Sequence, residues 1–236
     1  MISCICPTLG RANLLEEAIE SFLRQDFEDD KELIILNDAD WQELSIEKHE
    51  EIRLYNVGER YPDMGTKWNT LVELAKYNVL VPWPNDDIML PWALSTFQAI
   101  LWGHEYIHPK GRHVMTSKEY RGFSHHGCQG IIAFTKNAWR EAGGYPKEYG
   151  GQDTGFLHRL RGLYGPHDPQ LSPEQAFFIY RWIGIPFHLS GIKTTEKWDG
   201  LYTQIQQRYP ETHINLKPHW DLDYVEVIKN AEWTLG

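Results

Sequence analysis

Short apolar runs alternate with segments of helical periodicity along the first hundred residues. The runs are continuous, which is typical of strands buried on both faces of a parallel sheet. They span Ile2–Cys6, Leu33–Leu36, Ile52–Val57 and Asn78–Trp83. Between the first two runs, apolar residues repeat with helical spacing at Leu14, Leu15, Ala18, Ile19, Phe22 and Leu23. The alternation predicts an α/β fold, with a parallel sheet and helices on both of its faces.

Local signals predict where several helices begin and end. Asn13 is a favoured N-cap residue and Glu16 stands three positions later, so the first helix is expected to open with a capping box. Further helices are expected at Thr66–Tyr77 and Pro91–Leu101.

The pattern is less regular after residue 100. It predicts strands at Ile131–Thr135 and Phe177–Trp182, and helices at Lys136–Ala142, Thr154–Leu163, Leu201–Arg208 and Tyr224–Glu232. Five histidines fall between these segments, and the glycines and prolines among them predict loops. They are His104, His108, His113, His125 and His126.

Asn85-Asp86-Asp87 directly follows the fourth apolar run. Ligands of open α/β sheets bind beyond the carboxyl ends of the strands. Adjacent carboxylates repel each other unless a cation compensates them, and such hard oxygen ligands suit Mg²⁺ or Mn²⁺ shared with substrate phosphates. Asp38 follows another strand and is expected on the same edge of the sheet. The competing interpretation of the triplet is a solvated turn.

Composition limits the classes of function. The chain has 236 residues, 42% of them hydrophobic, which is enough for one large domain with a true core. The formal net charge is −10, and this disfavours a nucleic-acid partner, which requires a basic face. The sequence contains neither an apolar stretch that could span a bilayer nor a signal peptide, so we expect a cytoplasmic protein. Cys4, Cys6 and Cys128 form no disulfide framework, and buried free thiols are expected.

The ordered set of motifs resembles the family 2 glycosyltransferases, which have the GT-A fold. Ile2–Thr8 is similar to the opening strand and Pro-Thr turn of that family, and Leu15–Ser21 to its first helix. Four later segments match the nucleotide motif, the Gly-x-x-Arg-Asn segment, the Asp-x-Asp motif and the Glu-Asp motif, in that order. They are Leu36–Ala39, Gly65–Asn69, Asn85–Asp87 and Gly151–Asp153.

The resemblance covers about residues 1–190 and implies a domain plan. Residues 1–191 would form a single GT-A domain, with a Rossmann-like, mostly parallel sheet. Residues 1–100 would be its nucleotide-sugar half, residues 101–191 a less regular acceptor half, and residues 192–236 a C-terminal extension. The chain departs from the family pattern at Asn37, Ala39, Asn85 and Gln152. These departures affect the donor nucleotide and the metal geometry.

The resemblance also implies roles in metal-dependent sugar transfer. Asp87 would ligate Mn²⁺ or Mg²⁺, and Asp86 would lie nearer the ribose or bridge through water. His188 would complete the metal site, and a hydrogen-bonded structural histidine is an equal alternative. The nucleotide-sugar donor, for which a UDP-sugar is favoured, would contact Pro7, Thr8, Arg11, Asp38 and Lys67. Arg11 and Lys67 have a competing interpretation as surface charges.

Asp153 is the candidate general base, which takes the proton of the acceptor hydroxyl. Its expected position at a helix N-terminus favours the ionised form, although capping that helix is the commoner role for such an Asp. One base and direct attack imply inversion at the anomeric carbon. Trp83 and Trp182 could stack on a sugar, and core packing is the better interpretation of each.

Two other functions stay open at this stage. One is a nucleotidyltransferase that makes nucleotide sugars, which is disfavoured because Pro7–Arg11 holds only one Gly and one Arg. The other is a non-catalytic sugar-binding module, which would not need both Asp87 and Asp153. A zinc site among the histidines is disfavoured against an acceptor-binding role. The acceptor, a carbohydrate or another hydroxyl compound, stays open, as do self-association and the role of the tail.

Overall fold

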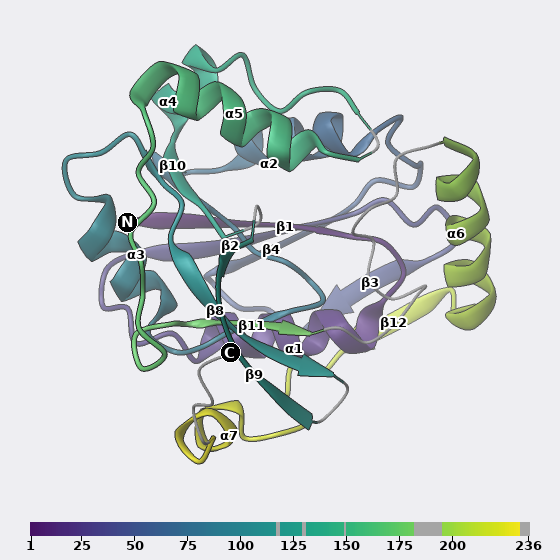
Figure 1. Ribbon diagram of the computed structural model, residues 1–236. Coiled ribbons are helices and arrows are strands. Elements are labelled where there is room, and N and C mark those ends of the chain that lie inside the picture. The colour runs from purple at the N-terminus through teal and green to yellow at the C-terminus, as the bar shows by residue number, and fades with distance from the viewer. Residues whose placement is uncertain (117–118, 129–130, 149, 182–194, 232–236) are drawn as a thin grey trace.

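The main sheet has six strands and is parallel over its first four. The computed structural model describes residues 1–116, 119–128, 131–148, 150–181 and 195–231. In the sheet, β4 (Ile52–Asn56), β2 (Lys31–Asn37), β1 (Ile2–Thr8) and β5 (Val79–Pro82) are neighbours in that order and run parallel. The short strands β10 (Ala133–Thr135) and β7 (Tyr106–Ile107) extend it beyond β5 with antiparallel pairings. The parallel sheet predicted from the alternating pattern is confirmed (Figure 1).

Helices cover both faces of this sheet, as expected. Successive side chains of β1 point to opposite faces: Cys4 and Cys6 belong to one buried cluster and Ile5 to the other. The first cluster packs against α1 (Ala12–Leu23) and α3 (Ala93–Leu101), and the second against α2 (Met64–Leu74), α4 (Lys136–Glu141) and α5 (Gln152–Tyr164). The two thiols are buried and free, as predicted.

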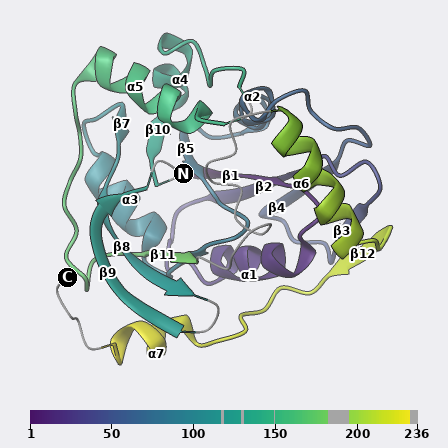
Figure 2. The ribbon, with the colours of Figure 1, turned by 45° about the vertical axis from the view of Figure 1, so that its right-hand side comes forward.

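A second sheet replaces the loops that were predicted for the histidine-rich region. Its strand order is β6 (Ile88–Met89), β11 (Phe178–Arg181), β8 (Lys110–Thr116) and β9 (Glu119–Gly127). The strands β8 and β9 form a long antiparallel pair that carries His113, His125 and His126 (Figure 2). Inward-facing positions alternate along β8, and a period of two is easily missed when glycine and histidine interrupt it. The prediction of loops was therefore wrong for His113, His125 and His126, and it is confirmed for His104 and His108.

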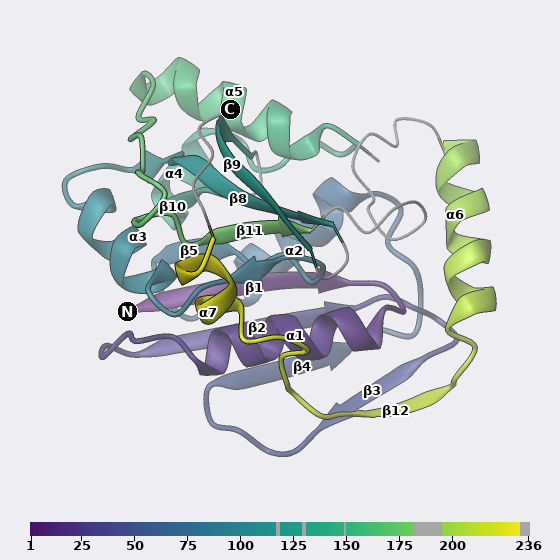
Figure 3. The same cartoon turned by 60° about the horizontal axis from the view of Figure 1, so that its bottom comes forward.

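The C-terminal segments return to the first half of the chain. Leu201 and Ile205 of α6 (Thr195–Arg208) pack on Leu9 and Ala39, which lie in the loops after β1 and β2. The strand β12 (His213–Leu216) pairs in parallel with β3 (Glu43–Ile46), and α7 (Tyr224–Lys229) follows (Figure 3). None of the helices in the described ranges is both long and apolar enough to cross a membrane.

Two helix starts differ from those predicted. The first helix begins at Ala12 without a side-chain cap, so the capping box at Asn13 was wrong. Its intended partner Glu16 instead accepts a hydrogen bond of 2.7 Å from the backbone N–H of Lys217. The second helix begins at Met64, two residues early, because Asp63 caps it by accepting a 2.7 Å hydrogen bond from the N–H of Thr66.

Candidate functional site

Four of the polar residues at the carboxyl ends of β1 and β5 are joined by hydrogen bonds. Arg11 Nη1 lies 2.9 Å from Asp86 Oδ2, and its Nη2 donates to Asn85 Oδ1 over 2.6 Å. Asn85 Nδ2 donates to Thr8 Oγ1 over 2.9 Å. Arg11 is only 3% exposed, so the interpretation of it as a solvated surface charge is wrong. A buried guanidinium in this place fixes the orientation of both Asn85 and Asp86.

Asp38 and Lys67 form a second buried group on the same edge of the sheet. Lys67 Nζ lies 2.5 Å from Asp38 Oδ1 and donates to the backbone oxygen of Thr8 over 2.6 Å. Lys67 is 2% exposed and is not a surface lysine. Burial lowers its pKa, and the charge of Asp38 opposes that shift. Because both groups include Thr8, the predicted donor-contacting residues on the loops are parts of one cluster.

The backbone around these residues is held by their own neighbours. Asn37, which replaces an acidic residue of the family motif, accepts a 3.2 Å hydrogen bond from the N–H of Ala39 and donates to the oxygen of Gln42 over 2.8 Å. These bonds shape the loop that presents Asp38. Pro7 pairs with Leu36 inside the sheet, one residue before the end of β1. Its predicted contact with the donor remains a prediction.

Asp86 and Asp87 are both buried, and they differ in their contacts. Asp87 Oδ1 accepts a 2.7 Å hydrogen bond from the backbone N–H of Arg181, whereas Asp86 is engaged by Arg11. Burial raises the pKa of Asp87 well above its usual range, and the charge of Asp86 raises it further, while the hydrogen bond from Arg181 and its charge oppose the shift. The solvated-turn interpretation of the triplet is therefore wrong.

The donor set fits a hard divalent cation. Asp86 and Asp87 both carry hard carboxylate oxygens, and the charge of Asp86 raises the pKa of Asp87, so an added cation would relieve the repulsion between them. Within the described ranges, His, Cys, Asp and Glu side chains form no group of three or more that could hold a metal ion. His188, the predicted third ligand, and Trp182 lie outside the described residues.

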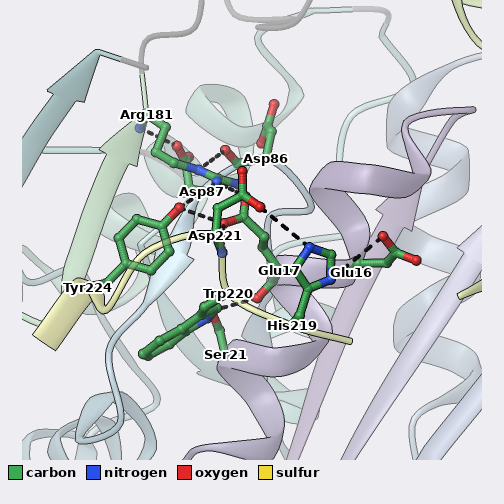
Figure 4. A network of polar contacts seen from close by, with 10 residues as sticks. All are labelled: Glu16, Glu17, Ser21, Asp86, Asp87, Arg181, His219, Trp220, Asp221 and Tyr224. Atoms are coloured by element: carbon green, nitrogen blue, oxygen red, sulfur yellow. Dashed lines mark hydrogen bonds and ion pairs between the residues drawn. The ribbon is translucent and has the colours of Figure 1, made fainter. Parts of the chain in front are cut away.

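The acidic pair rests on three residues that sequence reasoning missed. Arg181 donates from Nε to the backbone oxygen of Asp86 over 2.9 Å and forms an ion pair with Glu17 of α1 (Figure 4). Tyr224 Oη donates to Glu17 Oε1 over 2.6 Å and accepts from Arg181 Nη1 over 3.1 Å. Glu17 is buried on α1 beside the apolar stripe, and nothing in the local sequence distinguishes it from the neighbouring acids Glu16 and Glu20.

Asp153 lies in the first turn of α5 and does not cap that helix. The N-cap is Gly151, at a φ of 85° that glycine adopts without strain, and it makes no side-chain capping bond. Asp153 Oδ1 accepts a 2.7 Å hydrogen bond from the N–H of Thr154. Burial raises the pKa of Tyr145, and the charge of Asp153 raises it further.

The start of α5 is attached to the start of α2, which carries Lys67. Asn69 accepts hydrogen bonds from the N–H of Tyr145 over 2.8 Å and from Trp139 Nε1 over 2.9 Å. Pro146 packs against Gly65 of α2 and against Gly155 of α5. The views of Figure 1 and Figure 3 both place the N-terminal end of α5 on the side where β1 ends. Asp153 therefore belongs to the same rim as the Asp38–Lys67 pair.

Substitution of Gly65 by alanine tests this attachment. An added Cβ would lie 1.8 Å from the backbone oxygen of Pro146, so α2 and the 145–147 segment must separate. We expect Gly65→Ala to lower the free energy of unfolding by more than ~2 kcal/mol in denaturant titrations, since overpacking against backbone cannot relax cheaply. Gly162→Ala in α5 is the control. No atom lies within 4 Å of that Cβ position, and alanine should stabilise the helix by ~0.5–1 kcal/mol.

Other candidate residues have structural surroundings. Trp83 is 1% exposed, and its Nε1 donates to the backbone oxygen of Ala18 over 2.8 Å, which confirms core packing. His113 is fully buried, and burial lowers its pKa to about 4, so it is neutral. His108 lies 3.3 Å from Asp168 and 3.2 Å from the oxygen of Cys128. No zinc cluster forms among the histidines of the described residues.

Solved structures share this architecture. The S. aureus TarS 1–349 structure in complex with UDP-GlcNAc aligns with 96% of this chain and 69% of its own, at a TM-score of 0.63 and 13% identity. The mannosyltransferase PcManGT from Pyrobaculum calidifontis, in complex with GDP-Man and Mn²⁺, aligns with 87% of this chain and 69% of its own, at a TM-score of 0.57 and 13% identity. No protein-family model and no curated protein matches the sequence. The fold that the sequence motifs imply is thereby confirmed: the chain has the GT-A fold of glycosyltransferases.

Proposed function

We propose that this protein is a family 2 glycosyltransferase that moves a hexosyl group from a nucleoside-diphosphate sugar to an acceptor hydroxyl, with inversion at the anomeric carbon. The observation that carries the proposal is the cluster at the carboxyl edge of the sheet. There Thr8 joins the Arg11–Asp86 pair to the Lys67–Asp38 pair, directly beside Asp87. Structures of similar fold contain UDP-GlcNAc or GDP-Man, which supports a nucleotide-sugar donor.

The buried charges suggest how the donor is held. Asp38 would accept hydrogen bonds from the base or ribose, as Lys67 holds its carboxylate in place. Arg11 would contact the donor, as predicted, and its buried pairing with Asp86 would orient the acidic triplet. Pro7 and Thr8 would contribute main-chain groups to the nucleobase pocket. A UDP-sugar is the favoured donor.

A divalent cation, Mn²⁺ or Mg²⁺, would be held by Asp87 together with Asp86. When bound, it would neutralise the charge that develops on the departing diphosphate. The contribution of the protein is to bring two carboxylates together in a buried place, where their mutual repulsion favours a cation. His188 remains the proposed further ligand.

Asp153 would act as the general base. As the acceptor oxygen attacks the anomeric carbon, its proton would pass to the Asp153 carboxylate and the bond to the diphosphate would break. Its main-chain attachment is rigid, since Asn69 and Pro146 fix the segment that precedes α5. One base with direct attack gives the inverted product.

Calorimetric titration with UDP, GDP, dTDP and CDP, each with and without Mn²⁺, tests the proposal. We expect one nucleotide, UDP in the favoured case, to bind tightly only in the presence of Mn²⁺. Equal binding with and without the cation would contradict the metal role of the acidic pair. Absence of binding by all four would contradict a nucleotide-sugar donor and favour the sugar-binding alternative.

A further inference from the structure

Arg181 contacts both members of the acidic pair. Its backbone N–H donates to the Asp87 carboxylate over 2.7 Å, and its Nε donates to the backbone oxygen of Asp86 over 2.9 Å. Its side chain is 4% exposed, so water screens its charge poorly. A guanidinium in this position attracts the same carboxylates that a divalent cation would require.

Glu17 supplies the opposite charge for that guanidinium. Its carboxylate forms a buried ion pair with Arg181 Nη1 and accepts a 2.6 Å hydrogen bond from the Tyr224 hydroxyl. Tyr224 in turn accepts from Arg181 over 3.1 Å. The Tyr224 hydroxyl therefore contacts both members of the ion pair. Tyr224 lies 207 residues after Glu17 in the sequence.

The segment that carries Tyr224 is attached along α1. The N–H of Asp221 donates to Glu17 Oε1 over 3.1 Å, and Trp220 Nε1 donates to Ser21 Oγ over 3.0 Å. Glu16 accepts from the N–H of Lys217 over 2.7 Å. Figure 4 shows Glu17, Ser21, Trp220 and Asp221 close together beneath Asp86 and Asp87. The C-terminal segment thus reaches the acidic pair through Glu17.

We propose that Glu17 and Tyr224 are positioning residues that set the divalent-cation affinity of Asp86 and Asp87 by holding and neutralising the guanidinium of Arg181. This inference rests on the proposed function, because it assigns a cation to the acidic pair. The C-terminal segment is then a part of the site. Removal of the negative charge of Glu17 leaves an uncompensated positive charge beside the two acidic residues, and that charge repels Mn²⁺.

The test is Mn²⁺ affinity, measured by electron paramagnetic resonance of free Mn²⁺ in the presence of the nucleotide that the wild-type chain binds. We expect Glu17→Gln to weaken Mn²⁺ binding by ~10–100-fold, the usual effect of losing a partner that orients a metal ligand. Tyr224→Phe keeps the ring and loses only the hydroxyl. It should shift the affinity in the same direction by less, and it provides the test if Glu17→Gln does not fold.

Two further variants separate positioning from plain stability. Ser21 of α1 accepts from Trp220 Nε1 over 3.0 Å and donates to the backbone oxygen of Glu17 over 2.9 Å. Ser21→Ala removes both bonds but alters none of the side-chain contacts among Glu17, Arg181 and Tyr224, so it should lower the melting temperature without changing Mn²⁺ affinity. Arg181→Gln in the Glu17→Gln background removes the stranded charge but keeps the backbone N–H that donates to Asp87. It should restore most of the affinity.

The outcomes distinguish this inference from the proposed function. If the wild-type chain binds neither Mn²⁺ nor any nucleotide, the proposed function is wrong. If the wild-type chain binds both, and folded Glu17→Gln and Tyr224→Phe bind Mn²⁺ as it does, the positioning role is wrong while the proposed function stands. An unrestored affinity in the double variant would overturn the electrostatic explanation.

Discussion

Asp153→Asn is expected to reduce sugar transfer by ~10²–10⁴-fold, the usual contribution of a general base. The amide cannot accept the proton of the acceptor hydroxyl. It can still accept the hydrogen bond that Thr154 donates to Asp153 Oδ1 over 2.7 Å, so the first turn of α5 should be preserved. The contacts among Thr8, Arg11, Asp38, Lys67 and Asp86 are untouched, so the affinity for the donor should remain within a few-fold of the wild-type value. Turnover with the donor and its acceptor, beside calorimetry with the donor, provides the measurement.

Glu148→Gln is the matched control for this substitution. Glu148 is exposed and its Oε2 lies 4.0 Å from the Cβ position of Gly151, so it places another carboxylate close to the start of α5. Its neutralisation should leave turnover nearly unchanged. Near-normal turnover of Asp153→Asn would show that Asp153 is not the base. A large loss in Glu148→Gln alone would transfer that role to Glu148.

Asp87→Asn is expected to abolish the metal-dependent part of donor binding. We expect Mn²⁺ affinity to fall by more than ~100-fold. Removal of a residue that only orients a metal ligand lowers metal affinity by ~10–100-fold, and removal of the ligand itself should lower it further. The asparagine oxygen can still accept from the N–H of Arg181, so no buried donor is left without a partner. Alanine at this position would lose that acceptor as well, and a folding defect would then confuse the result.

Asp168→Asn is the control for general destabilisation. Asp168 contacts Arg161 over 2.7 Å and Lys110 over 3.3 Å, on a different part of the fold. Its loss should lower stability but preserve Mn²⁺-dependent binding. Proton competition offers a second check: because burial raises the pKa of Asp87, wild-type Mn²⁺ affinity should increase as the pH is raised. Mn²⁺-dependent binding that survives in Asp87→Asn would place the cation elsewhere.

The parallel half of the fold was predictable because each buried strand is a continuous apolar run. Leu33–Leu36 can hardly be exposed on either face, and it lies within β2, which is paired on both sides, with β4 and β1. The hairpin of β8 and β9 was not predictable in the same way. Buried positions alternate with partly buried ones along β8, Phe123 is the one buried residue of β9, and Gly111 and Gly122 interrupt the hairpin at φ values of 111° and 128°. In a sequence, glycine at such positions is usually interpreted as a turn or loop signal.

The residues of the candidate site also differ in how far their positions could be predicted from local sequence. Residues that follow a strand end, such as Asp38 and Asp87, could be predicted from one local segment. Glu17 could not, because its partners are distant: Arg181 stands 164 residues later and Tyr224 stands 207 residues later. Local patterns carry no information about pairings of that length. The short-range signals also misplaced Glu16, which bonds to Lys217 in preference to its own helix end.

The pairing of β12 with β3 has a consequence for the order in which this chain becomes functional during synthesis. His213–Leu216 is synthesised long after Glu43–Ile46. The strand β3 therefore has no β12 to pair with at the time when the parallel sheet is already able to form. Glu17 likewise lacks its ion-pair partner Arg181 and its hydrogen-bond partner Tyr224 until those residues have been synthesised. Such late, long-range contacts close slowly. The acidic site would therefore be completed only after the edge of the parallel sheet that carries Asp38 and Lys67 has formed.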